Sequence, residues 1–143
     1  MKLIIPIAGN EKEFINYFKT SRHLIKIDNV CILQRIINCF DNKLIDQIII
    51  ICKSQQYTQF KSKFKSTNTK LTFIKLNKVT NNQIETIKYA EKYLKDTDKI
   101  LVINPDALFK IKPDTINKLK SESLANYSGT IFYFHQYESN NLY

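Results

Sequence analysis

The sequence predicts an α/β fold in which a mostly parallel sheet lies between two layers of helices. Short apolar, β-branched runs recur along the 143 residues, and segments with helical spacing of apolar side chains separate them. The chain also has only two glycines and three prolines, so no long linker interrupts this alternation. Strands that alternate with helices are typical of parallel sheets with helices on both faces, which form three-layer sandwiches.

The first third of the chain predicts one strand and one amphipathic helix. Residues 2–7 form an apolar run that ends at a glycine turn, as expected for a buried strand. A polar segment with scattered aromatic residues follows, and residues 24–27 are expected to be extended. We expect Asp28 and Asn29 to cap the next helix. Its apolar positions recur at helical spacing: Ile32, Leu33, Ile36, Ile37 and Phe40.

The remainder predicts four more strands separated by three helices. The run of residues 48–52 is continuously apolar, which indicates a central strand that is covered on both faces. The other expected strands are residues 71–76, 99–104 and 129–135, and the expected helices are residues 54–65, residues 84–94 and a short one opened by Pro113.

Composition and charge describe an ordinary globular domain, which we expect to span residues 1–143. The chain is 43% hydrophobic and 24% charged, with a net charge of +9. Such a charge permits binding to polyanions. However, the cations are scattered lysines, with Arg22 and Arg35 the only arginines, a mixture typical of AT-rich coding sequence. We therefore expect no nucleic-acid partner, and the sequence does not indicate an oligomeric state.

The cysteines and apolar segments point to a cytoplasmic protein without a membrane partner. Cys31, Cys39 and Cys52 form no CxxC pair and are expected to be buried, reduced thiols. No stretch approaches the roughly 18 apolar residues that a membrane span requires. The sequence also contains no P-loop, GxGxxG or GxSxG motif.

Three loops follow the carboxyl ends of predicted strands, where parallel sheets bind ligands. In the first, the backbone amides of Ala8, Gly9 and Asn10 could face a phosphate, and Gly9 would permit a close approach. The other interpretation is an ordinary turn at the end of a strand. In the last loop, Asp106 could bind Mg²⁺ or could simply begin an Asx turn.

The middle loop contains consecutive amide side chains before the third predicted helix. Asn82 and Gln83 could pair with the donor and acceptor edges of a base. The alternative is that Asn81 or Asn82 caps that helix.

Four segments in order resemble the sugar-phosphate nucleotidyltransferase family. The segment Ile-Ile-Pro-Ile-Ala-Gly-Asn at residues 4–10 is similar to the family's opening strand and loop. Residues 22–28 stand where the family has a K-P-L-I-x-[IV] segment. Residues 81–86 resemble its N-G-Q-A-x-T segment, and residues 102–106 resemble a strand that ends in N-x-D.

The resemblance implies a Rossmann-like, nucleotide-diphospho-sugar transferase-like fold. It also implies a reaction in which a nucleoside triphosphate and a sugar phosphate combine with the help of Mg²⁺ and release pyrophosphate. The residue roles that the resemblance implies are nucleotide binding by Ala8, Gly9, Asn10, Asn82 and Gln83, metal binding by Asp106, and catalysis by Arg22 in place of the family's lysine.

The chain departs from the family pattern in its first loop, where G-x-G-x-R is replaced. Glu11 and Glu13 stand at the second glycine and the arginine, and we expect both carboxylates to repel a triphosphate. His23 replaces the family's proline, and Asn82 adds a side chain where the family has glycine. The chain ends at Tyr143, so the domain is expected to be truncated at its C-terminal end relative to the family. A degenerate nucleotide-binding or assembly module, or a related glycosyltransferase, is therefore the alternative.

Overall fold

The fold is built around four parallel strands in a computed structural model that describes residues 1–40 and 45–105. The strands are β1 (Lys2–Pro6), β4 (Gln47–Lys53), β5 (Lys70–Leu76) and β6 (Ile100–Val102). Their order in the sheet is β5-β4-β1-β6, and each neighbouring pair is parallel. The chain thus builds the sheet outward from β1 in one direction and then crosses β1 to add β6 on its other side. This is the doubly wound arrangement of Rossmann-like proteins.

Strand β4 lies at the centre of the hydrophobic core. Its residues 48–52 are all buried, as the continuous apolar run predicts. Ile48 and Ile50 face one core cluster, whereas Ile49 and Ile51 face the other, because successive side chains of a strand point to opposite faces. The sheet is therefore covered on both sides.

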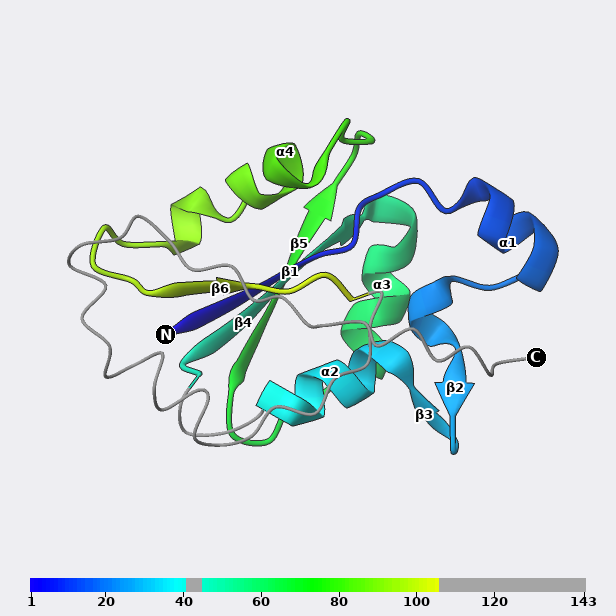
Figure 1. Cartoon of the computed structure of the whole chain (residues 1–143), viewed down its shortest axis with the longest axis horizontal. Helices are drawn as coiled ribbons and strands as arrows, with labels where there is room; N and C mark the ends of the chain where they lie inside the picture. Colours follow the sequence, from blue (N-terminus) through cyan, green and yellow to red (C-terminus); the bar gives the residue numbers. More distant parts are fainter. Residues whose placement is uncertain (41–44, 106–143) are drawn as a thin grey trace, which may run out of the picture.

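Helices from different parts of the chain form the two covering layers (Figure 1). Two helices cover one face of the sheet and contribute to the same core cluster. The helix α2 (Ile32–Phe40) buries four apolar side chains there, and α3 (Ser54–Lys63) buries Phe60. On the other face, α4 (Gln83–Lys88) and the 3₁₀ turn η2 (Glu91–Tyr93) pack Ile87 and Tyr93 against the second cluster. The predicted three-layer α/β architecture is confirmed.

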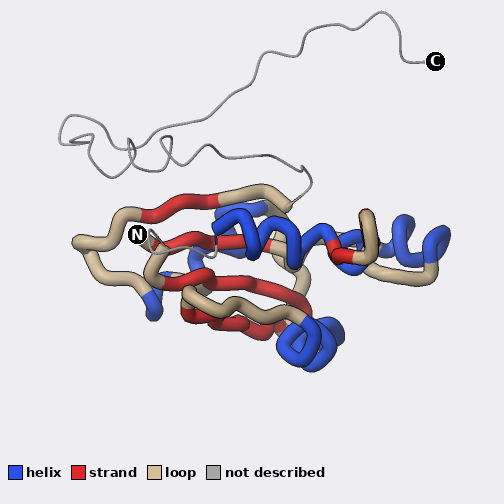
Figure 2. Tube along the Cα trace, turned by 90° about the horizontal axis from the view of Figure 1, so that it is seen from below, coloured by secondary structure: helices blue, strands red, loops and turns tan. Residues whose placement is uncertain are grey.

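A further helix and a hairpin lie beyond the carboxyl ends of the strands (Figure 2). The helix α1 (Lys12–Phe18) has no buried residue. It is followed by the 3₁₀ turn η1 (Arg22–Leu24) and by the antiparallel hairpin of β2 (Lys26–Ile27) and β3 (Val30–Cys31). These elements occupy the connection between β1 and α2.

Three local predictions are corrected. Asp28 and Asn29 do not cap a helix: with φ of 48° and 64° they form the two-residue turn of the β2–β3 hairpin, where a primed turn needs positive φ at both positions. The third predicted helix ends at Lys88 and continues only as η2. Cys31 and Cys52 are buried as expected, but Cys39 is exposed because it lies on the outer side of α2.

Some predictions fall on residues that the structure does not describe. The helix opened by Pro113, the strand at residues 129–135 and Asp106 lie outside the described residues. Within residues 1–40 and 45–105, no helix combines the length and apolar character needed to cross a membrane.

Candidate functional site

Loops from three strands converge on one cleft of about 310 Å³ at the carboxyl edge of the sheet. Pro6 and Ile7 line it at the end of β1, residues 80–83 line it after β5, and Asn104 and Pro105 line it after β6. Because β1 and β6 are neighbours that the chain reaches in opposite directions, this is the topological switch point where doubly wound sheets bind ligands. Its volume lies at the lower end of small-molecule pockets, roughly 300–1,000 Å³.

The cleft brings together five of the residues that the sequence singled out: Gly9, Asn10, Arg22, Asn82 and Gln83. Ala8 does not line it. Its side chain is fully buried in the core on the α4 side of the sheet, so only its backbone could reach a ligand. Asp106 lies outside the described residues, although its neighbour Pro105 lines the cleft.

Gly9 brings the backbone of the first loop close to Arg22. Its φ is not positive, so no backbone conformation requires glycine at this position. A Cβ placed there would stand 3.9 Å from Arg22 Nη2, an ordinary van der Waals distance. The missing side chain therefore leaves the guanidinium next to bare backbone at the wall of the cleft.

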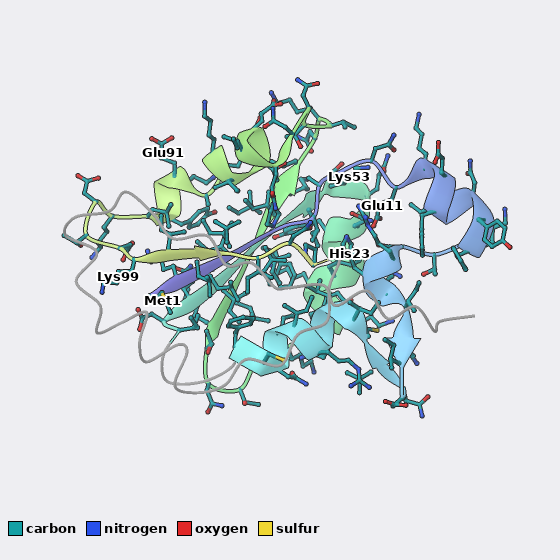
Figure 3. The ribbon with its side chains drawn as sticks, in the orientation of Figure 1. Met1, Glu11, His23, Lys53, Glu91 and Lys99 are labelled. Atoms are coloured by element: carbon teal, nitrogen blue, oxygen red, sulfur yellow. The ribbon has the colours of Figure 1, made fainter. Side chains whose placement is uncertain are left out.

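Glu11 lies buried behind this wall, next to His23 (Figure 3), and contacts residues of η1, of α3 and the residue before η1. Its Oε1 accepts a hydrogen bond from Arg22 Nε at 3.0 Å and lies 3.1 Å from His23 Nε2. Its Oε2 accepts hydrogen bonds from Ser21 Oγ at 2.9 Å and from Gln56 Nε2, on α3, at 2.8 Å. The carboxylate thus ties the loop after β1 to η1 and to α3.

These contacts keep the Glu11 carboxylate ionised. Burial by itself would raise its pKa, but the hydrogen bond and charge of His23, with hydrogen bonds from Ser21 and Gln56, lower the pKa to about 2. The expectation that Glu11 repels a triphosphate is corrected, because its charge is paired with neighbouring donors instead of facing the cleft.

His23, at the family's proline position, is buried at the inner wall of the cleft. Its side chain is 2% exposed and meets the Phe60 ring edge-to-face at 6.3 Å between centroids. It therefore packs η1 onto α3, whereas the adjacent Arg22 side chain is 39% exposed.

Glu13 differs from Glu11 because it remains in solvent. It is exposed in the first turn of α1. It lines a second concavity of about 250 Å³, and the other lining residues are Asn10, Glu11, Lys12, Phe14 and Arg22. Since Arg22 and Asn10 line both hollows, Glu13 places an unburied negative charge beside the main cleft.

Asn82 caps α4, which is the alternative that sequence reasoning left open. Its backbone is extended, with φ −154° and ψ 173°, so the position needs no glycine. Its Oδ1 accepts a hydrogen bond from the Glu85 amide at 2.9 Å, and Glu85 Oε2 accepts one from the Asn81 amide at 2.9 Å. This reciprocal capping fixes the loop and turns the Asn82 side chain toward the helix.

Sequence reasoning missed a pair of threonines in the cleft wall. The hydroxyls of Thr80 and Thr86 are 2.6 Å apart, and Thr86 Oγ1 also donates to the Asn82 carbonyl at 3.2 Å. Both side chains are buried and line the cleft. Two threonines six residues apart carry no recognisable sequence signal, because the contact depends on the fold of the loop between them.

The described residues contain few side chains that could bind a metal ion. Residues 1–40 and 45–105 contain no group of three or more His, Cys, Asp or Glu side chains that could hold an ion. Such a set is not required for Mg²⁺, which commonly takes one or two carboxylates plus phosphate oxygens of the substrate. Asn104, at the cleft, offers one amide oxygen, and Asp106 follows two residues later in the sequence.

The sheet order and the polar cleft at its switch point define the class of Rossmann-like α/β proteins. Comparison with known families then narrows this class, because residues 18–143 match the family described as nucleotidyl transferase. The chain belongs to the nucleotidyl transferase family, which confirms the predicted resemblance. The match includes Arg22, Asn82, Gln83 and Asp106 and begins after Gly9. Comparison with curated proteins gives no match.

Proposed function

We propose that the cleft binds a nucleoside triphosphate with Mg²⁺ and that the chain transfers its nucleotidyl group to a sugar phosphate. The observation that carries this proposal is the convergence of Gly9, Arg22 and Gln83, from three separate segments, on one cleft at the switch point. The family match supports the class of reaction. The proposal adds the substrates, the metal and the roles of the individual residues.

The base would lie against the amide side chains at the start of α4. Asn82 Oδ1 is already occupied by the helix cap, so Gln83 and the remaining Asn82 Nδ2 would meet the base. Gln83 is exposed at the cleft and can offer both a donor and an acceptor. Base selection would therefore depend mainly on Gln83.

The phosphates would lie between the first loop and Arg22. The backbone amides of Gly9 and Asn10 can donate to phosphate oxygens, and the Arg22 guanidinium supplies a permanent positive charge. Asp106 would help to hold Mg²⁺, which stabilises negative charge on the phosphates when it is bound. A sugar-phosphate oxygen would attack the α-phosphorus in line, the bond from that phosphorus to the bridging oxygen would break, and pyrophosphate would leave.

Titration calorimetry with each nucleoside triphosphate in the presence of Mg²⁺ tests the binding step. We expect saturable heat for at least one nucleotide and weaker binding in the Arg22→Gln and Asp106→Asn variants. No heat for any nucleotide at millimolar concentration would refute the proposal. Pyrophosphate release with a panel of sugar phosphates then tests the transfer step separately.

A second candidate function is a nucleotide-binding or assembly module without catalysis. The exposed Glu13 carboxylate beside the cleft favours this alternative, because it opposes a triphosphate where the family carries an arginine. Nucleotide binding without pyrophosphate release for any sugar phosphate would support this second function.

A further inference from the structure

We propose that Glu11 is a positioning residue that holds the Arg22 guanidinium in place as the phosphate-binding cation of the cleft. The inference rests on the proposed function, since it assigns a role within the same nucleotide site. Glu11 stands where the family pattern has its second glycine, and the proposed role explains what a carboxylate does at this position.

The contacts of Glu11 divide between its two oxygens. Oε2 accepts hydrogen bonds from Ser21 Oγ at 2.9 Å and from Gln56 Nε2 at 2.8 Å, and these bonds hold the carboxylate in place. Oε1 is thereby directed toward Arg22 Nε at 3.0 Å and lies 3.1 Å from His23 Nε2. The Glu11 side chain is 1% exposed, so water does not compete for these bonds.

The geometry of arginine makes this contact useful. A guanidinium is planar and presents donors on different edges, so a bond at Nε fixes the orientation of the whole group. Here Nε faces Glu11, and Nη2 lies beside Gly9 at the wall of the cleft. The buried carboxylate therefore orients the cation without standing between it and a ligand.

The charges along the cleft explain why such an anchor matters. Among the described residues that line the cleft, Arg22 is the only one with a permanent positive charge. A long, half-exposed arginine otherwise loses side-chain entropy when it binds phosphate. Holding it in advance lowers that cost, so affinity for phosphate should depend on Glu11 although Glu11 itself does not touch the ligand.

The first test needs no ligand, because it observes the Arg22 side chain directly. The chain has only two arginines, so only two Nε–H signals need to be assigned. We expect the Arg22 Nε–H signal in NMR spectra to exchange slowly with water in the native chain and rapidly in Glu11→Gln. The Arg35 signal serves as an internal control, since its Nε donates to the Ile27 carbonyl at 3.2 Å and should not change. An Arg22 signal that is unaffected by the substitution would overturn the proposal.

The second test compares a nucleoside triphosphate plus Mg²⁺ with the corresponding nucleoside. Glu11→Gln should weaken the triphosphate about tenfold, the effect of roughly one charge-assisted hydrogen bond, and leave the nucleoside unchanged. The same substitution should have no further effect in an Arg22→Gln background. Equal losses for both ligands, or additive losses in the double variant, would show that Glu11 only stabilises the fold.

Two controls keep the tests decisive. If Glu11→Gln does not fold, Glu11→Asp retains the charge but withdraws the carboxylate by one methylene, and the same loss of Arg22 protection is expected. If the native chain binds no nucleotide, the proposed function fails and the phosphate role of Arg22 fails with it. The ligand-free spectra would still report whether Glu11 holds Arg22, so the two failures are distinguishable.

Discussion

At the scale of single residues, two glutamates at the start of α1 lie in different environments. Glu11 and Glu13 are two positions apart, and both replace residues that would favour an anion. Glu11 is buried and surrounded by donors, whereas Glu13 is exposed on α1. The sequence alone cannot separate them, because their difference depends on Ser21 and Gln56, which approach from 10 and 45 residues away.

The buried Glu11 predicts a loss of stability in acid. Its pKa is lowered to about 2 in the folded chain from an ordinary value of 4.5, so its stabilising contribution is complete above about pH 5. It disappears as the pH falls toward 2. At about 1.4 kcal/mol per pKa unit, the contribution is up to about 3 kcal/mol. Denaturant unfolding of the native chain and Glu11→Gln over this range should show a steeper acid loss for the native chain; parallel curves would contradict the prediction.

The exposed Glu13 predicts a gain in affinity on charge reversal. Glu13→Arg should strengthen triphosphate binding several-fold, because it replaces repulsion beside the cleft by attraction. Glu91→Arg is the matched control, since Glu91 is exposed on η2 and lies away from Glu11 in Figure 3. It changes net charge by the same amount. Titration calorimetry at low salt measures both, and equal effects would indicate only a general influence of net charge.

At the scale of elements, the short helix α4 depends on its cap. Asn82→Ala should cost about 1 kcal/mol of unfolding free energy, because the Glu85 amide loses its acceptor. Asn82→Gly restores the residue of the family pattern and should cost only a few tenths of a kcal/mol. Chemical denaturation compares the two variants. A glycine variant that is as unstable as the alanine variant would argue against the capping role.

The central strand β4 should tolerate truncation far less than the strand β6. Ile50→Ala removes a fully buried side chain from the core and should cost about 2–5 kcal/mol. Ile100→Ala, in β6, is the control, because Ile100 is 46% exposed and its truncation should cost less than about 1 kcal/mol. The difference appears as a shift in the denaturant midpoint, and similar midpoints would contradict the assigned core.

The strands were the most predictable elements. The run at residues 48–52 predicted a strand buried on both faces because no polar residue interrupts it, and β4 confirms this. The hairpin was missed for a physical reason. Asp28 and Asn29 favour both helix caps and positive-φ turns, and the choice between them depends on whether β2 and β3 pair.

At the scale of the whole molecule, the sheet order determines where the candidate site lies. The alternation of strands and helices predicted a parallel sheet and three loops at one edge, and five of the singled-out residues line the cleft there. The sequence could not predict which side chains face the cleft. The Ala8 side chain lies in the core, and the Asn82 side chain caps its own helix. The contact between Thr80 and Thr86 depends on the folded loop.

The central claim is that this cleft, and not another surface, binds a nucleotide. The most direct measurement is a map of backbone and arginine side-chain NMR shifts during addition of a nucleoside triphosphate with Mg²⁺. The account predicts that the signals of Gly9, Arg22 and Gln83 shift together and saturate. Residues 66–68, which line a separate hollow with Lys63 and Lys65, should remain unchanged. Shifts confined to that basic hollow, or none at millimolar nucleotide, would contradict the account.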